Sequence, residues 1–257
     1  MEPQPPGYPV PPPPPSPPPY GGPPVLPGTF SFGDVLGETF STYTANFLAF
    51  VTITALVSLP MILATVVMGS NPLAAFVPLL LGFVTGPIGA GAITYGVYEY
   101  LRGRQTTVGD CLRVGLAKIL PILGVGILSG LIVVAGIVLC IIPGLIAATM
   151  LALAVPVAIQ EKADIAEALR RSASLTEGYR WTVFGVIFII GLINGGVGMV
   201  IGLIFGASGH PEKAQLVAQI FGILVGGLGA TAPAVMYYRL RSVKESVDVR
   251  DIASVFD

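Results

Sequence analysis

Six long apolar runs without a charged residue restrict the fold of this 257-residue chain more than any other feature. The runs cover approximately residues 46–68, 73–97, 119–142, 144–160, 181–206 and 215–238, and none contains Asp, Glu, Lys, Arg or His. A helix needs about 20 apolar residues to cross the hydrocarbon core of a bilayer. Because a bilayer offers the backbone no water to bond, such runs are expected to be helical. The sequence therefore predicts an all-α membrane protein with six transmembrane helices.

Composition supports a membrane protein and gives no sign of a metal or cofactor site. Hydrophobic residues make up 53% of the chain and charged residues 11%, whereas soluble domains carry about 25% charged residues. Cys111 and Cys140 are too few for a disulfide framework and lack metal-site spacing, and His210 has no Cys or His companion. We expect no cofactor. The formal net charge of −1 does not indicate nucleic-acid binding, and membrane lipids are the expected partners.

Three related polar segments precede the three pairs of apolar runs. Each opens with Ser, Thr or Asp and has Asp or Glu three residues later, which is a capping-box pattern at the start of a helix. The pairs are Ser31 with Asp34, Thr107 with Asp110, and Asp164 with Glu167. Behind each box, less polar residues recur at helical spacing. The pattern predicts three hairpins of two spans, each preceded by an amphipathic helix at the membrane interface.

The third segment, residues 164–177, divides cleanly on a helical wheel. Arg170 and Arg171 fall on its polar side, where a helix lying in the interface meets water and lipid headgroups. Gly178 suits the left-handed position that ends such a helix. We expect the arginines to fix topology, to contact anionic lipid, or to pair with Glu167 and Glu177; topology is the first expectation.

The distribution of basic residues predicts the orientation. Of 13 Lys and Arg residues, all except Lys213 follow or precede the spans on one side. Because positive charge is retained on the cytoplasmic side, this side and both termini are expected to be cytoplasmic. The candidate contacts to lipid headgroups or partners are Arg113, Arg170, Arg171, Arg180 and Trp181.

Two features lie within the spans. Asn194 is the most polar side chain deep in a run, and we expect it to bond a neighbouring helix. Pairs of glycines four residues apart are expected to mark close helix packing. They are Gly82/Gly86, Gly126/Gly130, Gly191/Gly195, Gly198/Gly202/Gly206 and Gly222/Gly226.

The chain divides into three parts. Residues 1–28 are a Pro-rich arm, with 15 prolines in the first 27 positions, and are expected to be a disordered cytoplasmic segment. The alternative for this arm is binding to a cytoplasmic proline-binding domain. Residues 29–241 form the six-span domain, and residues 242–257 are expected to be a cytoplasmic tail.

The membrane portion resembles a known bacterial family, the membrane domain named after glycerophosphoryl diester phosphodiesterases. The resemblance covers about residues 30–250 and is most specific at "IIPG" (Ile141–Gly144), "EALRRS" (Glu167–Ser172) and "YYRLR" (Tyr237–Arg241). It implies a protein of the bacterial cytoplasmic membrane. Some members of that family carry a catalytic barrel, which this chain lacks, so the resemblance implies no phosphodiesterase activity.

Two classes of function remain from the sequence. The first is a non-catalytic membrane protein that organises lipid or partners through its interfacial helices and arm. The second is a transporter, permease or flippase for a lipid-like or small neutral substrate; the absence of charge in the spans counts against ion coupling. A membrane enzyme ranks third, because only the edge carboxylates Glu99 and Glu161 could serve as acid or base. The oligomeric state is left open.

Overall fold

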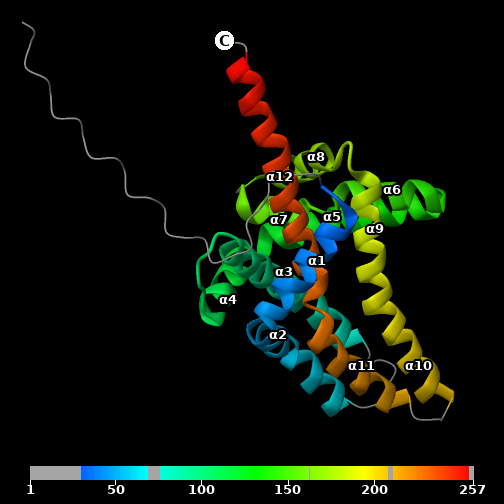
Figure 1. Ribbon diagram of the computed structural model, residues 1–257. Helices are drawn as coiled ribbons and strands as arrows, with labels where there is room; N and C mark the ends of the chain where they lie inside the picture. Colours follow the sequence, from blue (N-terminus) through cyan, green and yellow to red (C-terminus); the bar gives the residue numbers. More distant parts are fainter. Residues whose placement is uncertain (1–29, 69–75, 162, 208–210, 255–257) are drawn as a thin grey trace, which may run out of the picture.

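The computed structural model describes residues 30–68, 76–161, 163–207 and 211–254 (Figure 1). The Pro-rich arm and His210 lie outside the described residues. Within those ranges the chain is helical, without a strand. The helices are α1 (Phe32–Ala45), α2 (Phe47–Met68), α3 (Phe76–Leu101), α4 (Val108–Ala117), α5 (Ile119–Leu139), α6 (Ile141–Leu151), α7 (Ala154–Gln160), α8 (Ile165–Thr176), α9 (Arg180–Gly191), α10 (Val197–Ala207), α11 (Pro211–Val225) and α12 (Leu228–Ser254).

Six helical segments among the described residues are long and apolar enough to cross a membrane. They are Phe47–Val67, Leu80–Leu101, Ile119–Leu139, Ile141–Gln160, Arg180–Phe205 and Leu216–Glu245. The prediction of an all-α multi-pass membrane protein is therefore confirmed. The last three segments are interrupted helices: α6 gives way to α7 at residues 152–153, a π-helical turn (Leu192–Gly196) joins α9 to α10, and residues 226–227 separate α11 from α12.

Two expected boundaries lie elsewhere in the structure. The turn between α5 and α6 is at Cys140, whose backbone is extended (φ −171°, ψ 145°), and not at Pro143, which separates the apolar runs 119–142 and 144–160. Pro143 is accepted in the first turn of α6 because the amide there has no helical partner to lose. At the other end, α12 continues through residue 241 to Ser254, so no helix boundary separates the spans from the expected tail.

The three expected amphipathic helices are α1, α4 and α8, which we call the elbows. Two of their capping boxes are formed: Ser31 Oγ accepts from Asp34 N at 3.2 Å, and Thr107 Oγ1 accepts from Asp110 N at 3.2 Å. Asp164 makes no such side-chain bond, so the third box is not closed, and α8 starts with Ala168 N donating to Asp164 O at 2.8 Å. Gly178 has the expected positive φ, 85°, where α8 ends.

Each elbow buries equivalent positions of the repeat. Val35, Cys111 and Ala168 are at most 3% exposed. One turn further, Thr39, Gly115 and Ser172 are also buried. Because Thr39, Gly115 and Ser172 are small, each elbow can pack closely on the neighbouring helices at this position.

The elbows connect three repeat units into a closed ring. Each unit consists of an elbow and the hairpin that follows it. Elbow α4 packs on α2 and α3, α8 packs on α5, α6 and α7, and α1 packs on α9 and α12. Each elbow thus contacts the hairpin of the preceding unit, and α1 closes the ring on the third. Helices α3, α7 and α12, one from each unit, contact one another.

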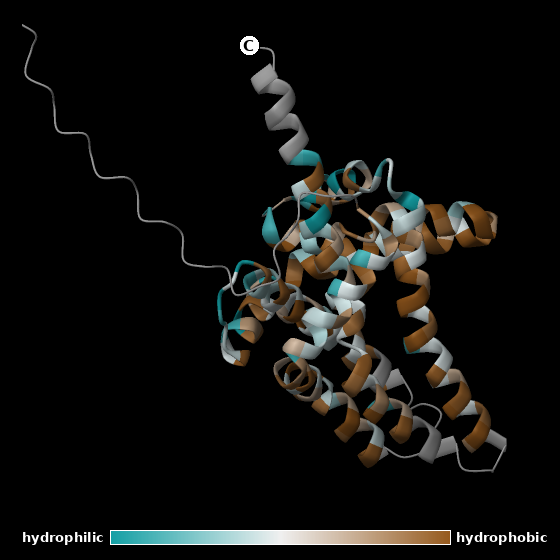
Figure 2. Ribbon diagram, viewed as in Figure 1, coloured by the Kyte–Doolittle hydropathy of each residue, from teal (hydrophilic) through white to brown (hydrophobic). Residues whose placement is uncertain are grey.

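The hairpin of α5 and α6 points in a different direction from the other two hairpins. Figure 1 shows it projecting sideways, across the direction of α2, α3 and α9 to α12. Its two helices approach so closely at Gly136 that a Cβ on this residue would lie 2.8 Å from the Cα of Gly144. Its tip is among the most exposed apolar parts of the structure, with Val138 80% and Leu139 84% exposed, and it is coloured as strongly hydrophobic in Figure 2.

Candidate functional site

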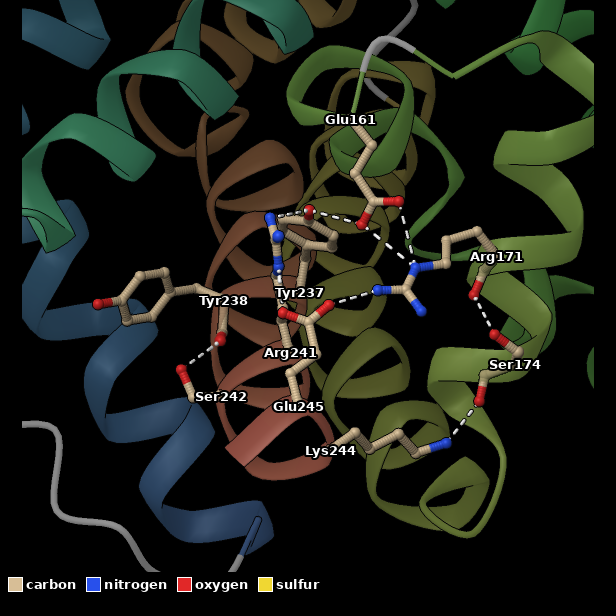
Figure 3. Close-up of polar contacts among 9 residues, drawn as sticks. All are labelled: Glu161, Arg171, Ser174, Tyr237, Tyr238, Arg241, Ser242, Lys244 and Glu245. Atoms are coloured by element: carbon tan, nitrogen blue, oxygen red, sulfur yellow. Dashed lines mark hydrogen bonds and ion pairs between the residues drawn. The ribbon is translucent and has the colours of Figure 1, made fainter. Parts of the chain in front are cut away.

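A network of charged side chains joins α7, α8 and α12, and Arg171 is at its centre (Figure 3). Arg171 Nε donates to Glu161, with Oε2 at 3.2 Å, and Arg171 Nη2 donates to Glu245 Oε1 at 2.5 Å. Glu161 follows α7, Arg171 lies on α8 and Glu245 lies on α12. One guanidinium therefore connects two consecutive segments, the end of α7 and α8, with the last helix of the chain.

Tyr237 and Arg241 close this network on α12. Tyr237 Oη donates to Glu161 Oε1 at 2.9 Å and accepts from Arg241 Nη1 at 3.2 Å. Arg241 Nε in turn donates to Glu245 Oε2 at 2.7 Å. Because two carboxylates balance two guanidiniums, the network has no excess charge with which to attract an ionic substrate. The network holds the end of α7, α8 and α12 together.

Two further contacts hold the elbows to α12. Lys244 Nζ donates to Ser174 O on α8 at 2.5 Å. Arg239 Nε donates to Glu38 on α1, and this carboxylate is buried. Sequence reasoning did not identify Glu38, Arg239, Tyr237 or Glu245. The signal available was the spacing of Tyr237, Arg241 and Glu245 at successive intervals of four, which places them on one face of a helix.

The structure assigns different surroundings to the two arginines that the sequence treated alike. Arg171 pairs with Glu161 and Glu245, and not with the expected Glu167 and Glu177. A contact of Arg171 with lipid headgroups stays a prediction. Arg170 is exposed, and its Nε makes a long contact of 3.4 Å to the carbonyl of Ala166 in its own helix. Arg170 keeps the surroundings that a headgroup contact needs.

The remaining candidate contacts are exposed. Arg113 lies on α4, and Arg180 and Trp181 begin α9. Trp181 is 86% exposed and its ring meets Phe184 edge-on, with 6.3 Å between centroids. An exposed indole at the start of a span has the placement of an interfacial anchor.

Arg113 borders a hollow between the end of α3, the following loop and α4, which we call the α4 hollow. Its volume is about 510 Å³. It is lined by Tyr95, Glu99, Arg104, Gln105, Thr106, Asp110, Arg113, Val114 and Ala117. Glu99 is 8% exposed, and its Oε2 lies 3.6 Å from Arg104 Nη1. The hollow therefore brings two arginines and two carboxylates together at the end of a span.

A second hollow, of about 410 Å³, lies within the membrane-spanning part between α2, α3 and the junction of α11 with α12. We call it the intramembrane hollow. Its lining is mainly glycine and small apolar residues, with the hydroxyls of Thr54, Ser58 and Thr85. The non-helical residues 226–227 form one wall. It has no charged lining residue, which suits a neutral or lipid-like molecule.

Asn194 has a different partner from the one expected. Its Nδ2 donates to Ile190 O at 3.0 Å, four residues earlier in the same span and beside the π-helical turn. A π-helical turn leaves a carbonyl without its usual helical donor, which the amide supplies.

Most of the expected glycine pairs do not mark close packing. Among the described residues, a Cβ on Gly126, Gly130, Gly191, Gly195, Gly198 or Gly202 would meet nothing within 4 Å. Close approaches occur instead at single glycines such as Gly115, where a Cβ would lie 2.4 Å from Ile88 O on α3.

Comparisons with family models, curated proteins and solved structures find no match to this chain. The resemblance carried by residues 141–144, 167–172 and 237–241 accordingly stays a prediction.

Proposed function

We propose that this protein is a non-catalytic multi-pass protein of the bacterial cytoplasmic membrane that organises lipid at its cytoplasmic surface. One observation supports the proposal: elbows α4 and α8 each bury one side and expose an arginine on the other. On α4, Cys111 is buried while Arg113 is exposed; on α8, Ala168 is buried while Arg170 is exposed. The buried faces hold the elbows in place, and the exposed arginines remain for headgroups.

The strength of this interaction follows from the charges. A basic side chain near an anionic leaflet contributes about 1 kcal/mol, screened by salt. Together with Arg180 at the start of α9, three exposed arginines give about 3 kcal/mol. That corresponds to roughly a hundredfold preference for anionic over net-neutral lipid at low salt.

Native mass spectrometry of the purified full chain, exchanged with equimolar phosphatidylglycerol and phosphatidylcholine, tests the proposal. The variant Arg113→Gln/Arg170→Gln/Arg180→Gln should lose most of its preference for phosphatidylglycerol. Lys213→Gln, which removes a charge from the first turn of α11, is the control and should keep the preference. Equal retention of phosphatidylglycerol by the triple variant and the wild type would exclude this function.

The intramembrane hollow favours a second function, the transfer of a lipid-like or small neutral molecule. Gly86 lines this hollow, and a Cβ there would meet nothing within 4 Å. Gly86→Leu should therefore fill the hollow without a clash. Gly126→Leu on α5, where a Cβ is equally unopposed, is the matched control.

Proteoliposomes with a fluorescent phospholipid in the inner leaflet measure this transfer by quenching from outside. If the second function is correct, wild type and Gly126→Leu accelerate transfer and Gly86→Leu does not. If the wild type transfers lipid no faster than empty liposomes, this phospholipid is not a substrate and the non-catalytic reading stands.

A further inference from the structure

The α4 hollow contains both signs of charge, which distinguishes it from a basic surface that merely attracts anionic lipid. Arg104 and Arg113 supply two cations, and Glu99 and Asp110 supply two anions. A ligand with one sign of charge would meet repulsion from half of these groups. A zwitterion can place each of its charges against the opposite one.

Glu99 indicates which kind of cation the hollow accepts. The residue is 8% exposed, whereas the Arg104 side chain is 69% exposed, and their closest N–O separation is 3.6 Å. This separation is longer than a hydrogen bond. Arg104 therefore offsets the charge of Glu99 but donates no hydrogen bond to it. A buried carboxylate is stabilised by donors. A primary ammonium supplies three, whereas a trimethylated ammonium has none.

The α4 side of the hollow supplies the complementary charge. Arg113 lies three residues after Asp110, on the same side of α4, and both line the hollow. A guanidinium binds a phosphodiester through paired N–H donors. Tyr95, Gln105 and Thr106 add neutral hydrogen-bonding groups to the same lining.

Apolar side chains continue from the hollow towards the spans. Leu116 is 56% exposed, and Leu120, at the start of α5, is 77% exposed. Leu116 follows Arg113 by about one helical turn of α4, and Leu120 lies in the first turn of α5, just beyond the break at Lys118. A lipid whose phosphate lies at Arg113 can therefore extend an acyl chain over these two leucines.

We propose that the α4 hollow binds the phosphoethanolamine headgroup of a phospholipid, with the ammonium at Glu99 and Asp110 and the phosphate at Arg113. The proposal rests on the lipid-organising function and names the lipid class for one of its sites. Binding of phosphoethanolamine in the α4 hollow requires the carboxylates of Glu99 and Asp110, whereas a general attraction of anionic lipid does not.

The test uses native mass spectrometry of the full chain with equimolar phosphatidylethanolamine, phosphatidylcholine and phosphatidylglycerol of identical acyl chains. The wild type should retain phosphatidylethanolamine at least about threefold over phosphatidylcholine. Arg113→Gln and Glu99→Gln should each bring this ratio close to one. Lys213→Gln, which removes a charge from α11 outside the lining of the hollow, should leave the ratio unchanged.

Soluble phosphoethanolamine, which has no chains to contact Leu116 and Leu120, should not displace the lipid at equal concentration. Displacement would show that the ligand is soluble and would overturn the lipid assignment. A wild-type ratio of one, or an unchanged ratio in Arg113→Gln, would overturn the headgroup proposal. Either result leaves the lipid-organising function standing, since its own readout is the phosphatidylglycerol lost by the triple variant.

Discussion

At the scale of single residues, Arg170 and Arg171 show how adjacent side chains acquire different roles. Neighbours on a helix differ by about 100° in direction, so both fitted within the polar half of the wheel. Only Arg171 reaches Glu161 and Glu245. The sequence could not indicate this, because Glu245 is 74 positions away, in the last helix of the chain.

Arg171→Gln should destabilise the protein and Arg170→Gln should not. The first change removes two ion pairs of a partly buried guanidinium and leaves two carboxylates without it. We expect a loss of about 1–2 kcal/mol, or about 3–6 °C in melting temperature for a domain of this size. Thermal unfolding in detergent measures both variants. Equal melting temperatures would show that the network does not hold α8 to α12.

The buried thiol of Cys111 should make the stability of the protein depend on pH. Its burial in α4 raises the pKa of the thiol, although a hydrogen bond with Thr106 and its own backbone opposes this. Below the ordinary thiol pKa of about 8.5, both folded and unfolded states keep the proton. Above it the unfolded state ionises first, so the free energy of unfolding should fall as pH rises.

Chemical denaturation between pH 7 and pH 10 should show a steeper decline for the wild type than for Cys111→Ala. Cys140→Ala is the control and should follow the wild type, because Cys140 is exposed. Parallel curves for wild type and Cys111→Ala would contradict the assigned shift.

At the scale of elements, the elbows depend on small residues at their closest approach. Gly115 is the clearest example, because a Cβ there would lie 2.4 Å from Ile88 O and 3.0 Å from Ala92 N. Its equivalent in the third unit, Ser172, donates to Met150 O at 2.7 Å and accepts from Leu153 N at 3.1 Å. These two hydrogen bonds satisfy the backbone carbonyl of Met150 and the amide of Leu153, where the fourth span is interrupted.

Gly115→Ala should destabilise the protein by about 1–3 kcal/mol, because backbone atoms of α3 cannot move aside as a flexible side chain can. Gly109→Ala in the same helix is the control. A Cβ there meets only Thr107 Oγ1, at 3.7 Å, and the gain in helix propensity should leave stability unchanged or slightly higher. Equal destabilisation by both changes would indicate that α4 is sensitive to any substitution.

The sequence predicted the elbows well because their signals are local. Capping residues and helical periodicity act within one or two turns, and they correctly placed Ser31, Thr107 and the end of α8 at Gly178. The glycine pairs failed for the opposite reason. A small residue permits close approach, but the pattern does not say whether a helix or lipid lies opposite; Gly126 and Gly191 have no close neighbour among the described residues.

At the scale of the whole molecule, the ring depends on contacts between the two ends of the chain. Elbow α1 closes it through Arg239 with Glu38 and through Tyr43 Oη, which donates to Leu224 O at 2.6 Å. The run lengths predicted six spans because crossing a bilayer sets a length requirement on each segment separately. They could not predict the sideways direction of the α5–α6 hairpin, which depends on packing between units.

Deleting residues 1–28 should leave the melting temperature unchanged, because a segment with 15 prolines in its first 27 positions is expected to form no helix or sheet. Deleting residues 1–45 should lower it strongly. The second deletion removes Val35 and Tyr43 from the core with the Glu38 ion pair, a loss on the order of 5 kcal/mol. Similar melting temperatures for the two truncated chains would contradict closure of the ring by α1.

The proposed lipid-binding surface requires that elbows α4 and α8 lie on the same side of the membrane. Single cysteines placed at residues 104, 170 and 210, in a chain whose Cys111 and Cys140 are replaced by alanine, measure this with a membrane-impermeant maleimide. Applied to intact cells, the reagent should label residue 210, and it should label residues 104 and 170 only after the membrane is opened. Labelling of residue 104 or residue 170 in intact cells would contradict the six-span arrangement and the lipid-binding surface proposed from it.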